Sequence, residues 1–541
     1  MKVRLNDSVK NFIFDKVYVA IVTISALIGY GYQITHCSYG VDDVIYDWYI
    51  DSGRLVSMGR FTPWLINKFF KINEFTPFII DFIGVILIIL AGTVLCAVFE
   101  DAIGAGKVPS WIYGVFTSLM LVYPMNGEVY IYYMHNGMGV AFLLSAIAVY
   151  LMYKVQGQKL KGQLLNDLIA VVLMVFGLCC YESFSLVIVT LGVCIVLLKS
   201  FSGEKLGIKA DGLWVVTVVV ATAVAMVLRS VITRILCAAM GLEVYQTSGG
   251  MIGWQFADNA GEIWTTLKNQ LMSNYIFYGA GYFPITLFLI AAAALIVMCV
   301  YFSIKNKDIW PIVLAVLVVI GQFSISFLIG VMQLYRMCQS IVVLVAFIVF
   351  AVMIILSKYK VGRIVAMVLS VLVVFEAARE INQLFAFEYN MCERCADKVK
   401  SIGEYLDANY DLSQQKIVFV GDFTRSIEEA DYLFISAGEP GYRFLNWCDV
   451  HVYDYDPAVV AAGRFYKIET ITDGDVLTWS TNAYGYHNWA TQRLFGHYGY
   501  DIRITDTAEE YYKIIDKYKD EYSDTDEDYL EIDGYVVVVL K

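Results

Sequence analysis

The segment 39–60, YGVDDVIYDWYIDSGRLVSMGR, brings many charged side chains together directly after the first long apolar run of the chain. Carboxylates can act as general bases toward a hydroxyl group, and guanidinium groups can hold a phosphate in a bidentate grip. Transfer of a sugar from a phosphate-linked donor uses both kinds of group. The same residues also suit a solvated acidic loop or the N-terminal caps of short helices. The charged residues are Asp42, Asp43, Asp47, Asp51, Arg54 and Arg60.

Asp42 and Asp43 are the candidates for the base, and the sequence favours neither of the two. Arg54 and Arg60 are candidates for binding a donor phosphate. Alternatively, these arginines snorkel at a membrane interface or pair with the neighbouring aspartates. The acidic cluster also suits a divalent cation, Mg²⁺ or Mn²⁺, because hard cations take oxygen ligands. Arginines can take the place of a metal at a phosphate, so both alternatives stay open.

Three more arginines lie in or beside apolar runs. Arg229 and Arg234 stand near the end of the run 212–238, and Arg336 stands in the segment QLYRMC. An arginine in or beside a transmembrane segment is by default a hypothesis for a functional site. The alternative is again snorkelling or pairing with a carboxylate. Of the three, we expect Arg229 and above all Arg336 to bind the donor phosphate.

Two other polar segments supply candidates for the same site. Glu128 and His135 lie in YPMNGEVYIYYMHN, and Tyr181 and Glu182 lie in CYESF, at the corner between two apolar runs. Each of these side chains could face a shared cleft, and each could equally be a structural hydrogen-bond partner.

The composition predicts the elements that must position these residues. Of the 541 residues, 59% are hydrophobic and only 17% are charged, and the mean hydropathy is +0.61. Soluble proteins carry about 25% charged residues, and a helix needs roughly 20 apolar residues to cross a bilayer. We therefore predict a polytopic α-helical membrane protein with about 11 transmembrane helices. The apolar runs fall near 17–35, 77–99, 109–124, 137–153, 164–180, 183–199, 212–238, 283–303, 309–330, 338–356 and 364–385.

Lysine and arginine clusters predict the orientation. With 11 helices, the clusters at 2–16, 154–161, 199–209, 305–307 and 358–363 all fall on one side of the membrane. The positive-inside rule makes this side cytoplasmic, together with the N-terminus. The opposite, extracytoplasmic side receives the segments 35–76, 125–136, 239–282 and 331–337, the corner at 180–182 and everything after the last run.

Two of the outer segments have patterns of their own. Residues 61–71, FTPWLINKFFK, place aromatic and aliphatic side chains on one side and Lys68 and Lys71 on another, which favours a short helix in the membrane interface. The segment 239–282 is predicted to be partly helical, with Trp254 and Trp264 suited to the headgroup level.

The chain after residue 388 differs from the rest in charge. Residues 388–541 hold 14 Lys and Arg against 30 Asp and Glu, whereas the remainder holds 25 against 21. An acidic domain after a slightly basic membrane part argues against nucleic acid as a partner. We predict a transmembrane domain at 1–388 and an extracytoplasmic α/β domain at 389–541. Its expected elements are helices at 392–409 and 507–517 and strands at 416–421 and 535–540.

Neither of two short motifs in this domain predicts a cofactor. Val420-Gly421-Asp422, which follows the first expected strand, lacks the GxGxxG spacing of a dinucleotide site. Cys392-Glu393-Arg394-Cys395 could form a disulfide or half of a metal site. A closed metal site uses four ligands, and no second CxxC follows, so we expect no metal there.

Taken together, these motifs resemble a known family. Val41-Asp42-Asp43 after the first helix, Ser-Gly-Arg54, Met-Gly-Arg60, the outer-loop Glu128 and the corner Tyr181-Glu182-Ser183 carry the resemblance. The chain is similar over roughly 10–385 to the bacterial glucosyltransferase family typified by phage-encoded, serotype-converting O-antigen glucosyltransferases, of the GT-C class. At the corner the family commonly has Tyr-Gln, where this chain has Tyr-Glu.

The resemblance implies a polyprenyl-phosphate-linked sugar, often glucose, as donor and a surface polysaccharide or glycolipid as acceptor. In GT-C enzymes the first outer loop supplies the base, which maps onto Asp42 or Asp43. The acidic domain matches no family motif, and it either binds the acceptor or covers the site. Three other functions remain: a transporter or flippase for a lipid-linked saccharide, a polysaccharide polymerase or ligase, and a non-enzymatic surface protein.

Overall fold

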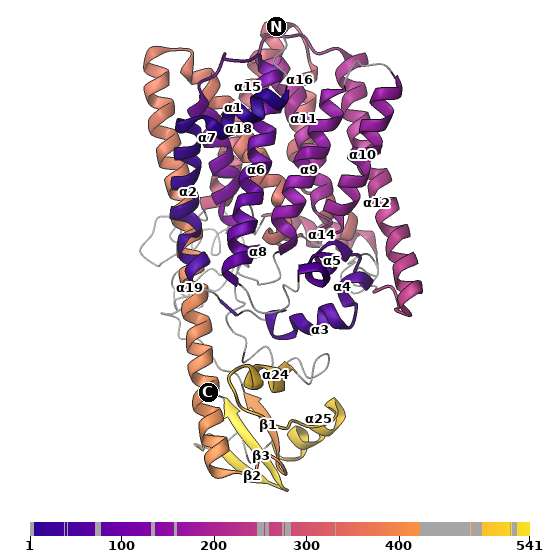
Figure 1. Ribbon diagram of the computed structural model, residues 1–541, viewed down its shortest axis with the longest axis vertical. Coiled ribbons are helices and arrows are strands. Elements are labelled where there is room, and N and C mark those ends of the chain that lie inside the picture. The colour runs from indigo at the N-terminus through magenta and orange to yellow at the C-terminus, as the bar shows by residue number, and fades with distance from the viewer. Residues whose placement is uncertain are drawn as a thin grey trace.

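A bundle of long helices carries a small sheet domain at one end (Figure 1). The computed structural model describes residues 5–36, 38–39, 42–70, 77–130, 136–155, 160–245, 254, 259–272, 275, 283–330, 332–421, 477, 490–519, 521 and 527–540.

Helices occupy all of the predicted apolar runs. The run predicted at 309–330 is divided into two helices near Gln322, whose side-chain amide donates to the Thr190 hydroxyl and to the Val318 carbonyl. The helices are α2 (Lys16–Thr35), α6 (Pro77–Ile103), α7 (Ser110–Val122), α9 (Asn136–Lys154), α10 (Leu160–Leu178), α11 (Phe184–Phe201), α12 (Leu213–Met240), α15 (Phe283–Asn306), α16 (Trp310–Gly321), α17 (Ser324–Ile329), α18 (Gln339–Ser357) and α19 (Lys360–Asn409).

Eight of the described helices are long and apolar enough to cross a membrane. The helices α10 and α16 are apolar but shorter, and α7 has 13 residues. Although short, α7 is buried from Ile112 to Val122, because it packs in the centre of the bundle against α2, α6 and α18. The prediction of a mostly helical membrane protein is confirmed, and the number of crossings stays a prediction. The eight are α2, α6, α9, α11, α12, α15, α18 and α19.

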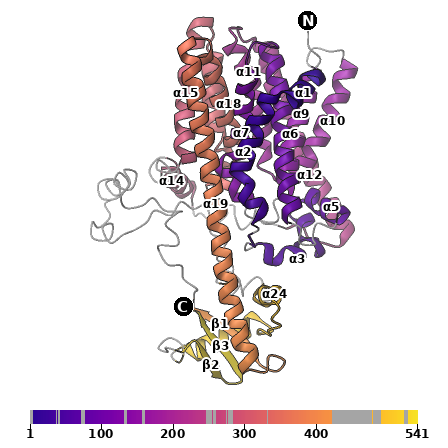
Figure 2. The same cartoon turned by 60° about the vertical axis from the view of Figure 1, so that its left-hand side comes forward.

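The helix α19 joins the bundle to the sheet domain. It runs for 50 residues from Lys360 to Asn409 and leaves the bundle as a single rod (Figure 2). The composition predicted two separate helices here, at 364–385 and 392–409. The structure joins them because no glycine or proline occurs between residues 364 and 402 to end the helix. The proposed domain boundary at residue 388 lies inside this helix.

The sheet domain has three strands in the order β1-β3-β2, with β1 (Lys416–Gly421) parallel to β3 (Tyr535–Leu540). The strand β2 (Tyr529–Ile532) is antiparallel to β3, and Asp533-Gly534 connects the two with positive φ at both residues, as in a tight hairpin. The helices α24 (Ala490–His497) and α25 (Ala508–Lys517) complete the described domain. The strands at 416–421 and 535–540 and the helix at 507–517 are confirmed, whereas the sequence did not predict β2 or α24.

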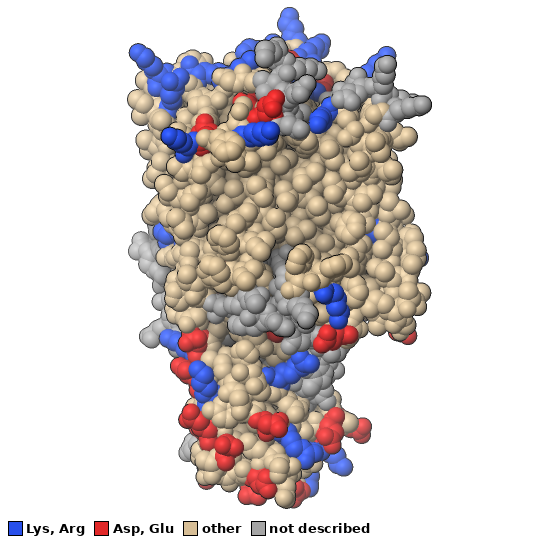
Figure 3. Space-filling view, in the orientation of Figure 1, with Lys and Arg blue, Asp and Glu red and all other residues tan. Residues whose placement is uncertain are grey.

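Charge is distributed unevenly along the molecule. Lys and Arg gather at the end of the bundle that carries the N-terminus, a broad uncharged band follows, and Asp and Glu are frequent over the sheet domain (Figure 3). Many apolar side chains of the bundle helices are exposed, such as Val216 and Val227 of α12, Leu317 of α16 and Val371 of α19. A surface of this kind suits contact with lipid.

Short helices cover the end of the bundle that faces the sheet domain (Figure 1). Two of them fit the patterns expected of the outer segments, since α5 forms within 61–71 and α14 within 239–282. Phe69 and Phe70, at the end of α5, are 81% and 74% exposed, which is consistent with a position in the membrane interface. The helices are η1 (Asp42–Ile45), α3 (Tyr46–Asp51), α4 (Arg54–Ser57), α5 (Phe61–Phe70), η2 (Pro124–Asn126), α8 (Gly127–Tyr130), α14 (Ala260–Leu271) and η8 (Tyr335–Met337).

The remaining helices lie at the other end. They are α1 (Leu5–Phe14) and η4 (Ile208–Gly212).

Candidate functional site

The segment 42–60 folds into η1, α3 and α4, and two glycines set its turns. Gly53 and Gly59 have φ of 70° and 77°, the left-handed region in which other residues are strained. At Gly59 an added Cβ would also lie 2.6 Å from Nη2 of Arg229. The missing side chain therefore lets α12 bring Arg229 directly against the loop, where Nη2 donates to the Met58 carbonyl at 3.1 Å.

Glu182 bridges two arginines of the candidate set. Nη2 of Arg229 donates to Oε1 of Glu182, and Nη2 of Arg60 lies 3.8 Å from Oε2 of the same carboxylate. The Arg229 side chain is 12% exposed, whereas the Arg60 side chain is 26% exposed. Arg229 is thus held tightly by Glu182 and the loop backbone, and the longer contact leaves Arg60 less firmly bound to the carboxylate.

The corner between α10 and α11 is also tied to the element that carries Arg336. The Ser183 hydroxyl donates to Oε1 of Gln339 at 2.5 Å. The amide nitrogen of Gln339 in turn donates to the Arg336 carbonyl. These two hydrogen bonds hold η8 beside Tyr181 and Glu182, although about 150 residues separate the two segments in the sequence.

Tyr181 lies where the candidate charges meet. Burial raises the pKa of its phenol, Arg60 and Arg336 act in the opposite direction, and Glu182 and Glu128 raise the pKa further. The guanidinium carbon of Arg60 lies 4.8 Å from the centre of the Tyr181 ring, a cation–π contact. We call this group the Tyr181 cluster. It consists of Arg60, Glu128, Tyr181, Glu182, Arg229 and Arg336.

Glu128 approaches the cluster from α8 and is only 3% exposed. Its charge also acts on Tyr275, whose pKa is raised mainly by burial. The helix α8 packs directly against α19, because an added Cβ at Gly127 would lie 2.5 Å from Cδ2 of Leu384. The contact between Gly127 and Leu384 shows that the Tyr181 cluster lies at the level of Leu384 along α19.

Arg54 has a different partner. Its guanidinium carbon stacks 3.1 Å from the centre of the Tyr245 ring, in the segment that follows α12. The backbone N–H of Tyr245 donates to the Ser57 carbonyl at 3.0 Å, which fixes this segment on α4. Arg234, which we singled out together with Arg229, is exposed on α12.

Asp43 lies beside α19, beyond the level of the Tyr181 cluster. It is 5% exposed, and its charge acts on the Cys392 thiol. Cys392 follows Leu384 by eight residues, which corresponds to about 12 Å along a helix axis. The structure therefore brings Arg60, Arg336, Glu128 and Glu182 together with Tyr181, and places Asp43 next to a separate group on α19.

Three predicted residues lie at least partly outside the description. His135 is not among the described residues, and for Asp42 and Asp47 only the backbone, in η1 and α3, is described. Among the described residues, no group of three or more His, Cys, Asp or Glu is arranged to hold a metal ion. Cys392 and Cys395 are both buried and in thiol form, so the disulfide that their spacing allowed is not formed.

No sequence pattern identifies several of the residues that shape the site. Gln339 and Tyr245 stand among ordinary helix and loop residues and acquire their roles through contacts with distant segments. Glu388 of α19 is 1% exposed and acts electrostatically on the same Cys392 thiol as Asp43, although the two carboxyl groups are far apart in the sequence. A glutamate in an otherwise apolar and aromatic segment, LFAFEYNMC, is the one signal that could have identified it.

A comparison with protein-family models matches residues 31–356 to the family described as glucosyl transferase GtrII. The matched range is more than half of the chain, and it contains Asp43 and the whole Tyr181 cluster. It ends before α19 and the sheet domain. No curated protein and no solved structure matches the chain.

Proposed function

The chain belongs to the GtrII glucosyl transferase family, and we propose that it transfers glucose from a polyprenyl-phosphate donor to a surface polysaccharide or glycolipid on the extracytoplasmic side of a membrane. The observation that carries the proposal is the Tyr181 cluster, which lies inside the matched range at the end of the bundle facing the sheet domain.

The cluster suits a donor phosphate. Among the described residues it holds three guanidinium groups and two carboxyl groups, and one carboxylate, Glu182, is closely paired with Arg229. Arg60 lies 4.8 Å from the centre of the Tyr181 ring, and both Arg60 and Arg336 act electrostatically on the Tyr181 phenol. Guanidinium groups stabilise the charge that develops on a leaving phosphate. We assign Arg60 and Arg336 to this role and Arg229 to holding the cluster together.

Asp43 or Asp42 serves as the base. In the proposed step the acceptor hydroxyl oxygen attacks the anomeric carbon of the sugar. The bond from that carbon to the phosphate oxygen breaks with its electron pair, and the hydroxyl proton passes to the carboxylate. If the displacement is direct and inverts the anomeric carbon, the base and the leaving phosphate lie on opposite sides of the sugar, which agrees with Asp43 and the Tyr181 cluster lying at different levels of α19.

The charge distribution supports the proposed side of the membrane. The end of the bundle opposite the sheet domain carries most of the Lys and Arg that frame the uncharged band (Figure 3). A cytoplasmic position for that end follows the positive-inside rule. The Tyr181 cluster, Asp43 and the sheet domain then face the extracytoplasmic side.

Separate and combined replacement of the two aspartates tests the proposal. Membranes containing the wild-type chain should form a glycosidic product from polyprenyl-phosphate glucose, which a flippase would not do. Asp42→Asn and Asp43→Asn, measured singly, identify the base by a loss of about 10²–10⁴-fold in rate. The double variant should lose transfer while still inserting into the membrane.

Asp51→Asn is the matched control. Asp51 belongs to the same loop but is exposed and pairs with Lys68 at 3.6 Å, so its replacement should leave transfer unchanged. Full activity in the Asp42→Asn, Asp43→Asn double variant would overturn the assignment of the base. Absence of any glycosidic product from the wild-type chain would overturn the proposed reaction itself.

A further inference from the structure

We propose that Glu388 of α19 is a positioning residue of the transfer site, which holds the loop bearing Asp43 against the stalk of the sheet domain. The inference rests on the proposed function, because it takes Asp43 as part of the catalytic loop. It extends the site beyond the matched range, which ends at residue 356.

One face of α19 lies against the loop. Glu388, Cys392, Cys395 and Val399 follow one another at intervals of four, three and four residues, which places them on one side of a helix. All four are buried, whereas Asn390, Glu393, Arg394 and Asp397 on the other side are exposed. Cys395 and Val399 share a hydrophobic cluster with Val44, the residue after Asp43. The face that carries Glu388 is therefore the face that contacts the loop.

One hydrogen bond and one electrostatic interaction connect the loop that bears Asp43 to the buried face of α19. The Cys392 thiol donates to the Tyr39 carbonyl at 3.5 Å. The Cys392 thiol also lies within reach of the charges of both Glu388 and Asp43. Two carboxyl groups from distant parts of the chain, one from the loop and one from α19, thus act electrostatically on a single buried thiol.

The residues on either side of this contact are fixed as well. Tyr389, next to Glu388, packs edge-on against the His36 ring with centroids 5.2 Å apart. On the far side, the Tyr39 ring stacks on His497 of α24, with centroids 4.1 Å apart and an angle of 7° between the planes. His36 is therefore in contact with α19, and Tyr39 is in contact with both α19 and the sheet domain.

The buried carboxyl group of Glu388 keeps the loop that bears Asp43 in place, rather than adding to the stability of the whole fold. Burying a carboxyl group costs free energy that an apolar side chain would avoid, so its presence next to the catalytic loop calls for a specific role. A displacement of about 1 Å in a catalytic group can lower the rate by about 10²-fold. Glu388 is well placed to prevent such a displacement of Asp43.

Glu388→Gln tests the inference, with Glu393→Gln as the control on the exposed side of the same helix. We expect Glu388→Gln to lower kcat by about 10²-fold while leaving the KM for the lipid-linked donor nearly unchanged. Glu388→Asp, which keeps the carboxyl group, should recover part of the loss. Glu393→Gln should behave as the wild-type chain.

A second readout does not depend on activity. Cys392 is 7% exposed, so a maleimide reagent should label it slowly in the wild-type chain. If Glu388 holds the loop, Glu388→Gln should speed labelling of Cys392, identified by peptide mass spectrometry, by more than Asp43→Asn does, since that variant also removes a negative charge acting on the thiol, while all the proteins elute as a single peak in detergent. Wild-type kcat and wild-type labelling in Glu388→Gln would overturn the inference. A wild-type chain that transfers no sugar would instead overturn the proposed function, and the labelling result would then stand alone.

Discussion

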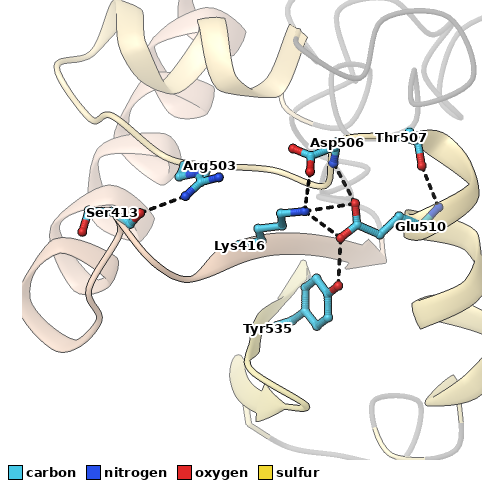
Figure 4. A network of polar contacts seen from close by, with 7 residues as sticks. All are labelled: Ser413, Lys416, Arg503, Asp506, Thr507, Glu510 and Tyr535. Atoms are coloured by element: carbon cyan, nitrogen blue, oxygen red, sulfur yellow. Dashed lines mark hydrogen bonds and ion pairs between the residues drawn. The ribbon is translucent and has the colours of Figure 1, made fainter.

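The Tyr181 cluster combines three guanidinium groups with two carboxyl groups, whereas the network around Lys416 in the sheet domain balances two cations with two carboxylates (Figure 4). Nζ of Lys416 lies 2.7 Å from Asp506 and 2.8 Å from Glu510. The Tyr535 hydroxyl also donates to Glu510, at 2.8 Å. In the Tyr181 cluster, Glu182 is in direct contact with Arg229, and its other carboxylate oxygen lies 3.8 Å from Nη2 of Arg60.

The two groups also differ in how the chain assembles them. Asp506, Thr507 and Glu510 lie within five residues at the start of α25, where the Thr507 hydroxyl caps the helix and accepts from the Glu510 N–H at 3.1 Å. Members of the Tyr181 cluster come from five separate parts of the bundle. The balanced network fastens the start of α25 to Lys416 of β1 and Tyr535 of β3. A group with more cations than anions, assembled from distant segments, suits an anionic ligand.

Among the tests of this comparison, the largest effect should follow from replacing the arginines assigned to the phosphate. Arg336→Met and Arg60→Met each remove a charged hydrogen-bond donor, worth about 1.5–3 kcal/mol. We therefore expect kcat/KM for the lipid-linked donor to fall by about 10–10²-fold in each variant. Transfer assays at varied donor concentration measure the change.

Arg503→Met is the matched control for these variants. Arg503 belongs to the Lys416 network and donates to the Ser413 carbonyl at 2.9 Å (Figure 4). Its loss should leave kcat/KM unchanged. An equal loss of transfer in Arg503→Met would remove the distinction between an anion site and a structural network.

Glu182→Gln should have the next largest effect, and it concerns stability. The amide removes the negative charge that Arg229 meets, while the amide oxygen can still accept a hydrogen bond. Because the Glu182 side chain is 34% exposed, we expect the free energy of unfolding to fall by about 1 kcal/mol, near the lower end for such contacts. Thermal unfolding in detergent measures this change.

Glu182→Gln also tests whether the Tyr181 cluster, unlike the Lys416 network, binds an anionic ligand. Removing a carboxylate increases the excess of positive charge in the Tyr181 cluster, so the KM for the donor should not rise. A clear rise in KM would mean that Glu182 contributes to donor binding itself.

The sequence predicted the helices of the bundle because long apolar runs have few alternatives in a membrane. It also predicted β1, β3 and α25, whose patterns are strong. The change in composition near residue 391 obscured the continuity of α19, which depends on the absence of helix-breaking residues rather than on hydrophobicity. Residue type alone identified the candidate residues, but it did not predict which of them lie together in the folded chain. The contact between Glu182 and Arg229 joins residues 47 positions apart, and no local pattern reveals it.

Lys416→Met should have a smaller effect than Glu182→Gln. The Lys416 side chain is 21% exposed and Asp506 is 72% exposed, and ion pairs at such positions contribute less than about 1 kcal/mol. We expect slightly faster proteolysis within the sheet domain and unchanged kcat/KM. A loss of transfer would indicate that this network communicates with the site through α24 and the loop at Tyr39.

The smallest effect concerns pH. Burial acts to raise the pKa of Glu510, but hydrogen bonds from Lys416, Tyr535 and the Asp506 N–H outweigh it and hold the pKa below its ordinary value. A carboxyl group with a lowered pKa stabilises the folded state above its unfolded pKa and ceases to do so as the pH falls through the folded value. Stability of the sheet domain should therefore decrease below about pH 4.3, the ordinary glutamate value. Glu510→Gln should flatten this part of the profile of unfolding temperature against pH. A profile that the substitution leaves unchanged would mean that other carboxylates of the acidic domain, rather than the Lys416 network, determine its response to acid.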